Sequence, residues 1–148
     1  MIKRQVIVDG YNLIRNDLTL SVIEARSLDA GRRALISRLS TTFDLRANDL
    51  TIVFDGSAAP LPVPASERFG SIKVVFSRQG ETADTVIKRL IAAAPPGQQV
   101  VLLSDDRELR SAAEARGGIA AGSAQHARPR AAPGRLNDKD RDDPPKNR

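Results

Sequence analysis

Short runs of apolar, largely β-branched residues recur along the chain, and most end at an acid or a turn residue. The runs that precede Asp9-Gly10 and Asp55-Gly56 show this arrangement most clearly. Such runs are typical of strands buried on both faces of a sheet. The pattern predicts four strands and a fifth, weaker one, at residues 5–8, 50–54, 72–77, 100–103 and 118–121.

Between these runs, apolar residues recur every three or four positions, which is the period of a helix. The spacing predicts a helix over residues 28–43, a second over 83–94 that stops at Pro95, and a third over 106–116 that stops at Gly117. Strands that alternate with helices predict an α/β fold with three layers, in which a mostly parallel sheet carries helices on both faces. In outline this fold is Rossmann-like.

Two stretches show neither the pattern of a strand nor the period of a helix. Residues 56–70 contain three prolines and predict an exposed loop between the second and third strands. From residue 124 onward the chain is rich in Ala, Pro and charged residues, with seven basic residues against four acids. So few large apolar residues cannot offset the entropy lost on ordering. We therefore expect one folded domain over residues 1–123 and a disordered basic tail over 124–148.

Composition removes several classes of protein. The 148 residues include no cysteine and one histidine, His126, which excludes disulfides, thiolate metal sites and cysteine nucleophiles and leaves little room for histidine catalysis. No apolar run is long enough for a membrane span, and polar residues near the start argue against a signal peptide, so we expect a soluble cytoplasmic protein with no membrane partner. The net charge of +5 suits an anionic partner, although surplus basic residues also serve solubility.

The acids that follow the predicted strands are the candidate chemical groups. Ligands of open parallel sheets bind outside the carboxyl ends of the strands, and Asp9, Asp55 and Asp105 follow three of them. Glu81 and Asp84 stand three residues apart at the start of the second predicted helix, which would place them on one helical face. We therefore expect these acids to converge on one edge of the sheet.

Each acid also has a structural alternative. Asp-Gly is a turn signal, an acid in a first helical turn stabilises the helix dipole, and Ser104 or Asp105 could cap the third helix opposite Glu108. Taken together, however, several carboxylates at one edge repel one another unless cations neutralise them. Oxygen ligands alone suit Mg²⁺ or Mn²⁺, and two such ions could generate hydroxide from water and stabilise the leaving oxygen of a phosphodiester. Asn12 could present its amide to that site or cap a turn.

Four segments also resemble, in order, the motifs of NYN-domain proteins of the bacterial YacP-like type, which are similar in fold to PIN-domain nucleases. The resemblance covers about residues 3–123. The segments are residues 9–14 (DGYNLI), 54–56 (FDG), 76–84 (FSRQGETAD) and 104–109 (SDDREL). The chain departs from the family pattern after Gly118, where a hydrophobic closing helix is expected and the sequence is polar.

The resemblance implies a PIN-like fold and cleavage of RNA that depends on Mg²⁺ or Mn²⁺. Position by position, it implies that the catalytic acids are Asp9, Asp55, Asp84 and Asp105, with Asp9, Asp84 and Asp105 as metal ligands. The accessory candidates are Asn12, Glu81 and Asp106.

RNA contact should be mostly electrostatic, because one tyrosine and four phenylalanines cannot supply a large stacking platform. Tyr11 is the best candidate for stacking on a base, with packing of the first loop as the alternative. The candidates for phosphate contact, besides the arginines of the tail, are Arg15, Arg78, Lys88, Arg107 and Arg110.

The sequence thus favours a metal-dependent endoribonuclease. One alternative is a catalytically inactive RNA-binding protein of the same fold. Another is a metal-dependent phosphohydrolase of a different Rossmann-like family, although the first acid lacks the Asp-x-Asp arrangement of an aspartyl-phosphate nucleophile. The sequence leaves open which RNA is bound, whether a partner such as the translation machinery delivers it, and the oligomeric state.

Overall fold

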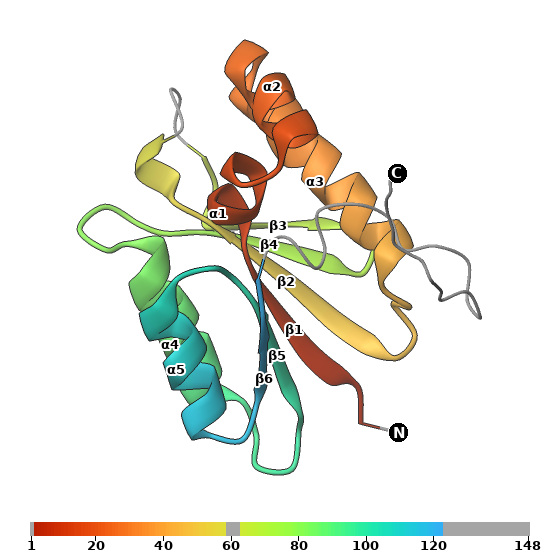
Figure 1. The fold of residues 1–148 in the computed structure, drawn as a ribbon, viewed down its shortest axis with the longest axis vertical. Coiled ribbons are helices and arrows are strands. Elements are labelled where there is room, and N and C mark those ends of the chain that lie inside the picture. The colour runs from red at the N-terminus through yellow and green to blue at the C-terminus, as the bar shows by residue number, and fades with distance from the viewer. Residues whose placement is uncertain (1, 59–62, 123–148) are drawn as a thin grey trace, which may run out of the picture.

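Six strands form the central layer of the computed structural model, which describes residues 2–58 and 63–122 (Figure 1). Their order in the sheet is β3-β4-β2-β1-β5-β6, and every neighbouring pair is parallel except the antiparallel pair β3–β4. The strands are β1 (Arg4–Asp9), β2 (Asn48–Phe54), β3 (Ser66–Phe69), β4 (Ile72–Phe76), β5 (Val100–Leu103) and β6 (Ile119–Ala121).

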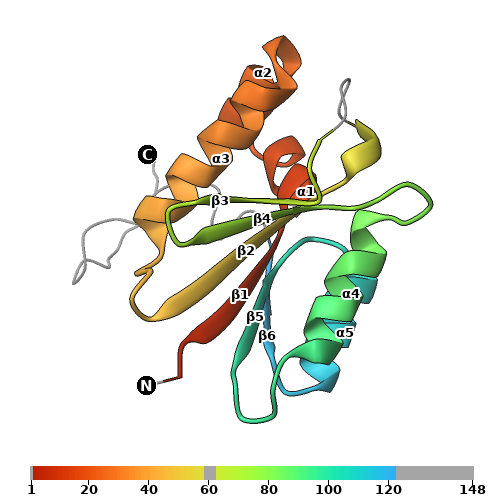
Figure 2. The ribbon, with the colours of Figure 1, turned by 180° about the vertical axis from the view of Figure 1, so that it is seen from behind.

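Helices cover both faces of this sheet, and the views from opposite sides show the same division (Figures 1 and 2). One face carries α1 (Gly10–Arg15), α2 (Leu18–Arg26) and α3 (Leu28–Thr42). The other face carries α4 (Ala83–Ala93) and α5 (Arg107–Ala115), which lie side by side. The predicted three-layer α/β fold is confirmed, as are all five predicted strands and all three predicted helices.

The apolar runs belong to strands that are buried on both sides. In β1, Val6 and Val8 pack into the core beneath α1–α3, whereas Ile7 packs into the core beneath α4 and α5, and none of the three is exposed. In β5, Val101 and Leu103 face the first core, and Leu102 faces the second. Alternate residues therefore enter different cores, which is why the runs read as continuously apolar.

The parallel register also fixes where the acids lie. Strand β1 pairs with β2 on one side and with β5 on the other, and all three run in the same direction. Asp9 ends β1, Asp55 follows β2, and Asp105 follows β5 by two residues. The expected convergence of these positions on one edge of the sheet is confirmed.

The predicted loop over residues 56–70 needs correction. It contains a 3-10 turn, η1 (Gly56–Ala58), and strand β3, which pairs with β4. All four residues of β3 are exposed, so this edge strand has no apolar alternation by which the sequence could reveal it. Helices α1 and α2 were not predicted either. In α2, Leu20 is buried while Leu18 and Val22 are exposed, so its apolar stripe is weak.

The expected tail, residues 124–148, lies outside the described residues. Within the described ranges, no helix combines the length and the apolar character that a membrane span requires.

A buried ion pair links helices α2 and α3. Asp17, which is 7% exposed, caps α2 by accepting a hydrogen bond of 2.8 Å from the backbone N–H of Leu20. Its second oxygen pairs with Arg38 of α3 at 2.5 Å. One carboxylate thus caps one helix and attaches it to the next.

This dual role predicts a large loss of stability when the carboxylate is removed. Asp17→Ala should lower the free energy of unfolding by about 3–4 kcal/mol, because it removes a helix cap and leaves Arg38 largely buried without this partner. The matched control is Asp29→Ala, whose exposed carboxylate pairs with the exposed Arg33 and with the largely buried Arg32; because Arg32 keeps its hydrogen bond to Tyr11, this loss should be less than about 1 kcal/mol. Urea unfolding measures both values. Equal losses would show that the Asp17–Arg38 pair does not hold the helices.

Candidate active site

We call the edge of the sheet where β1, β2 and β5 end, together with the start of α4, the acidic edge. Its acids are Asp9, Asp55, Asp84, Asp105 and Asp106, and Asp9 lies at its centre. The residue is 8% exposed, and its Oδ2 accepts a hydrogen bond of 2.9 Å from Ser104 Oγ. Burial raises the pKa of the Asp9 carboxyl to about 6, against the lowering effect of the Ser104 hydrogen bond. The negative charges of Asp84, Asp106 and Asp105 raise this pKa further. The structure therefore gathers four carboxylates from β1, α4 and the β5–α5 loop.

Asp84 belongs to the same group. It is the second residue of α4 and is partly buried. Burial raises the pKa of its carboxyl, and so does the negative charge of Asp106, while Lys88 opposes the increase. Lys88 is itself paired with Glu108 at 2.7 Å, so its charge is shared between acids.

Two side chains hold the β5–α5 loop in place beneath these acids. Ser104 is fully buried, and its Oγ accepts the backbone N–H of Asp106 at 3.0 Å while donating to Asp9. Asn12 Oδ1 accepts the backbone N–H of Asp105 at 2.9 Å, which ties the loop to α1. The cap of α5 is Asp106, whose Oδ1 accepts the N–H of Leu109, and not Ser104 or Asp105.

Ser104 is the functional position that the sequence reasoning considered only as a cap. A serine at the end of a buried strand, directly before two acids, was the available signal. Its hydroxyl is fully buried, and a buried hydroxyl must find both a donor and an acceptor.

Asp55 has a different environment from Asp9. Its Oδ1 accepts hydrogen bonds from the backbone N–H and the hydroxyl of Ser57, at 3.0 and 2.7 Å, and from Ser77 Oγ at 3.2 Å. These bonds lower the pKa of the Asp55 carboxyl, led by the Ser57 hydroxyl, and the positive charge of Arg15 adds to the decrease. Asp55 is therefore a stable anion at the same edge, held by hydroxyls and a cation.

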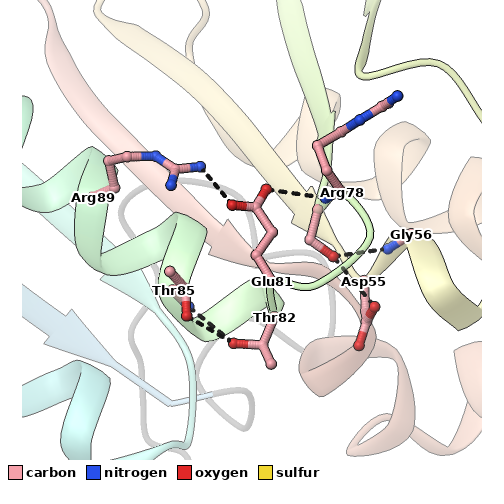
Figure 3. Close-up of polar contacts among 8 residues, drawn as sticks. Asp55, Gly56, Arg78, Glu81, Thr82, Thr85 and Arg89 are labelled. Carbon is pink, nitrogen blue, oxygen red and sulfur yellow. Dashed lines mark hydrogen bonds and ion pairs between the residues drawn. The ribbon is translucent and has the colours of Figure 1, made fainter.

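Both carboxylate oxygens of Glu81 bind groups that are close in sequence (Figure 3). Its Oε2 accepts the backbone N–H of Arg78 at 3.0 Å, and its Oε1 pairs with Arg89 at 3.1 Å. The Arg78 N–H leads in lowering the pKa of the Glu81 carboxyl. Because Thr82 caps α4, Glu81 precedes the helix. The expectation that Glu81 and Asp84 share one helical face is therefore wrong.

The glycines after Asp9 and Asp55 are required by close approach. A Cβ on Gly10 would overlap the ring of Phe54, and a Cβ on Gly56 would overlap the carbonyl oxygen of Ser77. Neither glycine has a positive φ, so the Asp-Gly pairs are not left-handed turns. The missing side chains allow the backbone after each acid to press against a neighbouring strand.

The basic candidates flank this edge. Arg15 lies over the ring of Tyr11 at 4.8 Å and pairs with Glu24 at 3.5 Å. Arg78 is exposed, and its side chain extends away from the Glu81 carboxylate (Figure 3). On α5, Arg107 is exposed and Arg110 is partly buried, and Lys88 faces Glu108 from α4.

Tyr11 does not present its ring at the edge. The residue is 5% exposed, its ring packs against Phe54 at 4.8 Å, and its hydroxyl accepts a hydrogen bond from Arg32. Tyr11 therefore packs into the core, which is the alternative to base stacking that the sequence left open, although the segment that carries it is helix α1 and not a loop.

The donor chemistry of the edge suits a hard divalent ion, although the described ranges contain no group of three Asp, Glu, His or Cys residues that could hold one. Mg²⁺ commonly binds through one or two carboxylates and keeps several waters, so a smaller donor set is sufficient. The Asp9 carboxylate, whose charged form is destabilised by burial and by the acids around it, could serve as a ligand of such an ion. The charges of Asp84, on α4, and Asp105, in the β5–α5 loop, act on the Asp9 carboxyl.

Comparison with known proteins places the chain among YacP-like proteins. The model of the family described as YacP-like NYN domain matches residues 6–128. The uncharacterized protein YacP of Bacillus subtilis strain 168 is 28% identical over 88 residues, which are 60% of this chain and 51% of that protein. The chain thus spans about half the length of this curated relative.

Two crystal structures of Rae1 (YacP) from Bacillus subtilis share the fold. One has a TM-score of 0.65 at 24% identity and covers 80% of this chain and 68% of its own. The other, a mutant form, has a TM-score of 0.64 at 23% identity and covers 84% of this chain and 72% of its own.

The raised pKa of Asp9 predicts a pH dependence of stability in metal-free protein. Because the folded-state pKa is about 6 and the ordinary value is 3.8, the folded protein binds the proton more tightly than the unfolded chain does. The stabilisation from protonated Asp9 is full below about pH 4 and is lost as the pH rises to 6, by about 3 kcal/mol. Asp9→Asn removes this loss, so the variant should be more stable than wild type at pH 7.5 and lose that advantage toward pH 4.

Urea unfolding in EDTA at several pH values measures this difference. Subtracting the two proteins cancels the other titrating groups. Wild-type and Asp9→Asn curves that run parallel from pH 4 to 7.5 would contradict a raised pKa at Asp9.

Proposed function

The chain belongs to the YacP-like NYN domain family, and from this membership and the acidic edge we propose that it is an endoribonuclease that depends on Mg²⁺ or Mn²⁺. The family is nuclease-like, which supports a hydrolase acting on phosphodiesters. The finer assignment, to RNA and to a divalent ion, is a proposal. RNA is favoured over a small phosphate ester because the acids lie at an edge flanked by arginines, which suits a polyanion.

One observation carries the proposal: the buried carboxylate of Asp9 feels the negative charges of three further carboxylates, those of Asp84 at the start of α4 and of Asp105 and Asp106 between β5 and α5. Burying an anion among like charges lowers the stability of the fold, and a bound cation would offset this loss. An inactive RNA-binding protein would have no use for such an arrangement, because clustered negative charge repels phosphates.

The residues divide the chemistry among them. Asp9, Asp84 and Asp105 would hold the divalent ion, and Asp106 would add negative charge while it caps α5. When bound, the ion lowers the pKa of water and stabilises negative charge on the phosphodiester. Asn12, fixed through its Oδ1, would turn its Nδ2 donors toward a phosphate oxygen.

Asp55 and the arginines would complete the site. Asp55 remains ionised near neutral pH because hydroxyls and Arg15 favour its charged form, so it suits a role in orienting water or in stabilising a cation at longer range. Arg15, Arg78, Arg107 and Arg110 would bind the RNA backbone on either side of the acids, and the basic tail would add sequence-independent affinity.

Cleavage of a labelled single-stranded RNA tests the proposal. Wild-type protein should cut it internally in Mg²⁺ or Mn²⁺ but not in excess EDTA, and it should leave 5′-phosphate and 3′-hydroxyl ends. Asp9→Asn, Asp84→Asn and Asp105→Asn should each reduce the rate by about 100-fold or more, since even outer partners of a metal site are worth about 10–100-fold.

The matched control is Asp49→Asn, an exposed acid in β2 that pairs with Lys3 at 3.9 Å and should leave cleavage unchanged. Undiminished cleavage in EDTA, or full activity in a variant lacking all three acids, would refute the assignment. Hydrolysis of para-nitrophenyl phosphate without RNA cleavage would favour a phosphohydrolase instead.

A further inference from the structure

Gly122, the first residue after β6, lies directly against the carboxylate of Asp105. Gly122 is buried, and a Cβ built on it would stand 2.5 Å from Asp105 Oδ1. The next nearest atoms are Arg110 Nη1 at 3.7 Å and Asp105 Cγ at 3.8 Å, which are ordinary van der Waals distances. The missing side chain therefore makes room for one carboxylate oxygen and for little else.

The backbone of Gly122 gives no other reason for a glycine. The positive-φ glycines among the described residues are Gly70, Gly80, Gly97 and Gly117. At Gly122 an alanine could therefore adopt the observed conformation, and the described atom closest to its methyl group would be the carboxylate oxygen of a short side chain. Substitution would move the Asp105 carboxylate without disturbing the sheet.

The rest of Asp105 is fixed by other elements. Asn12 Oδ1 holds its backbone N–H from α1, and the preceding Ser104 is buried and bonded to Asp9. Asp105 itself is exposed. On the β6 side, the Asp105 carboxylate occupies the space that a side chain at position 122 would fill.

We propose that Gly122 is a positioning residue that seats the Asp105 carboxylate at the acidic edge, so that the short edge strand β6 takes part in building the site. This inference rests on the proposed function, in which Asp105 helps to hold a divalent ion. It assigns a role to a residue that lies outside the strand-end motifs and carries no functional group.

A mutant cycle in metal-free protein tests whether Gly122 acts through Asp105. Gly122→Ala should lower the melting temperature of wild type, because the methyl group displaces the carboxylate, and should have no effect in an Asp105→Ala background, where the clashing oxygen is absent. Gly118→Ala is the control. Its Cβ would lie 2.8 and 2.9 Å from the carbonyl oxygens of Val100 and Ala113, so it should destabilise both backgrounds equally.

Metal binding and kinetics test the functional half. Gly122→Ala should weaken Mn²⁺ binding, followed by the electron spin resonance signal of free Mn²⁺, by about tenfold or more, as loss of an outer-shell partner does. It should lower kcat for RNA cleavage and leave KM for RNA unchanged, because Gly122 touches no proposed RNA contact except the end of Arg110.

Equal effects of Gly122→Ala in both backgrounds, or wild-type Mn²⁺ binding in a folded Gly122→Ala protein, would overturn the positioning role. Wild-type protein that neither binds Mn²⁺ nor cuts RNA would overturn the proposed function instead. In that case a coupled result in the metal-free cycle would still support the seating of Asp105 by Gly122.

Discussion

A carboxylate that is buried next to other carboxylates is the constraint around which this molecule is arranged. Asp9 ends the strand that runs between β2 and β5, and the parallel direction of these strands brings their following residues to the same edge. Water contributes little to stabilising the charge there, so the folded protein holds its proton more tightly than an exposed aspartate would. The hydrogen bond from Ser104 offsets only part of this effect.

Two serine–aspartate hydrogen bonds at this edge have the same arrangement, but the pKa values of the two carboxyl groups shift in opposite directions. Ser77 follows β4 and Ser104 follows β5, and each hydroxyl accepts a backbone N–H and donates to the acid of an adjacent strand. At Asp55, further bonds from Ser57 make the carboxylate a stable anion. At Asp9, burial and neighbouring acids outweigh the bond.

This asymmetry separates Asp55, whose charged form the protein stabilises, from Asp9 and Asp84, whose charged forms are destabilised by burial and by neighbouring acids. A site that binds a cation needs the second kind, since a carboxylate whose charge is already stabilised by several hydrogen bonds, as that of Asp55 is through Oδ1, has less to gain from a metal. The arrangement therefore favours Asp9 over Asp55 as the central acid of the proposed site, a distinction that three similar strand-end acids in the sequence do not reveal.

The sequence predicted the elements whose pattern depends on the core. The strands around Ile7 and Leu102 and the helix around Ile87 and Ile91 are buried enough to impose a clear period. The exposed strand β3 and the weakly amphipathic helix α2 bury too little to leave one. The hydrophobic period of an element depends on how much of it is buried, so elements at the margin of the core show no clear period.

For the site, the sequence placed the acids on the correct edge because parallel topology alone decides that. It could not assign Tyr11 to the core, because the decisive contacts come from Phe54 and Arg32, far away in sequence. Nor could it find the contact between Gly122 and Asp105, which depends on the pairing of β6 with β5. Side-chain partners across strands are a property of the assembled sheet.

The most direct test of the central claim is a crystal structure of the protein grown with Mn²⁺, with the ion located by its anomalous scattering. The account predicts an anomalous peak at the acidic edge, within coordination distance, about 2.0–2.3 Å, of a carboxylate oxygen of Asp9. Asp84 or Asp105 should coordinate the same ion directly or through water. A well-ordered edge with no peak beside Asp9 at saturating Mn²⁺, or an ion bound only elsewhere, would contradict it.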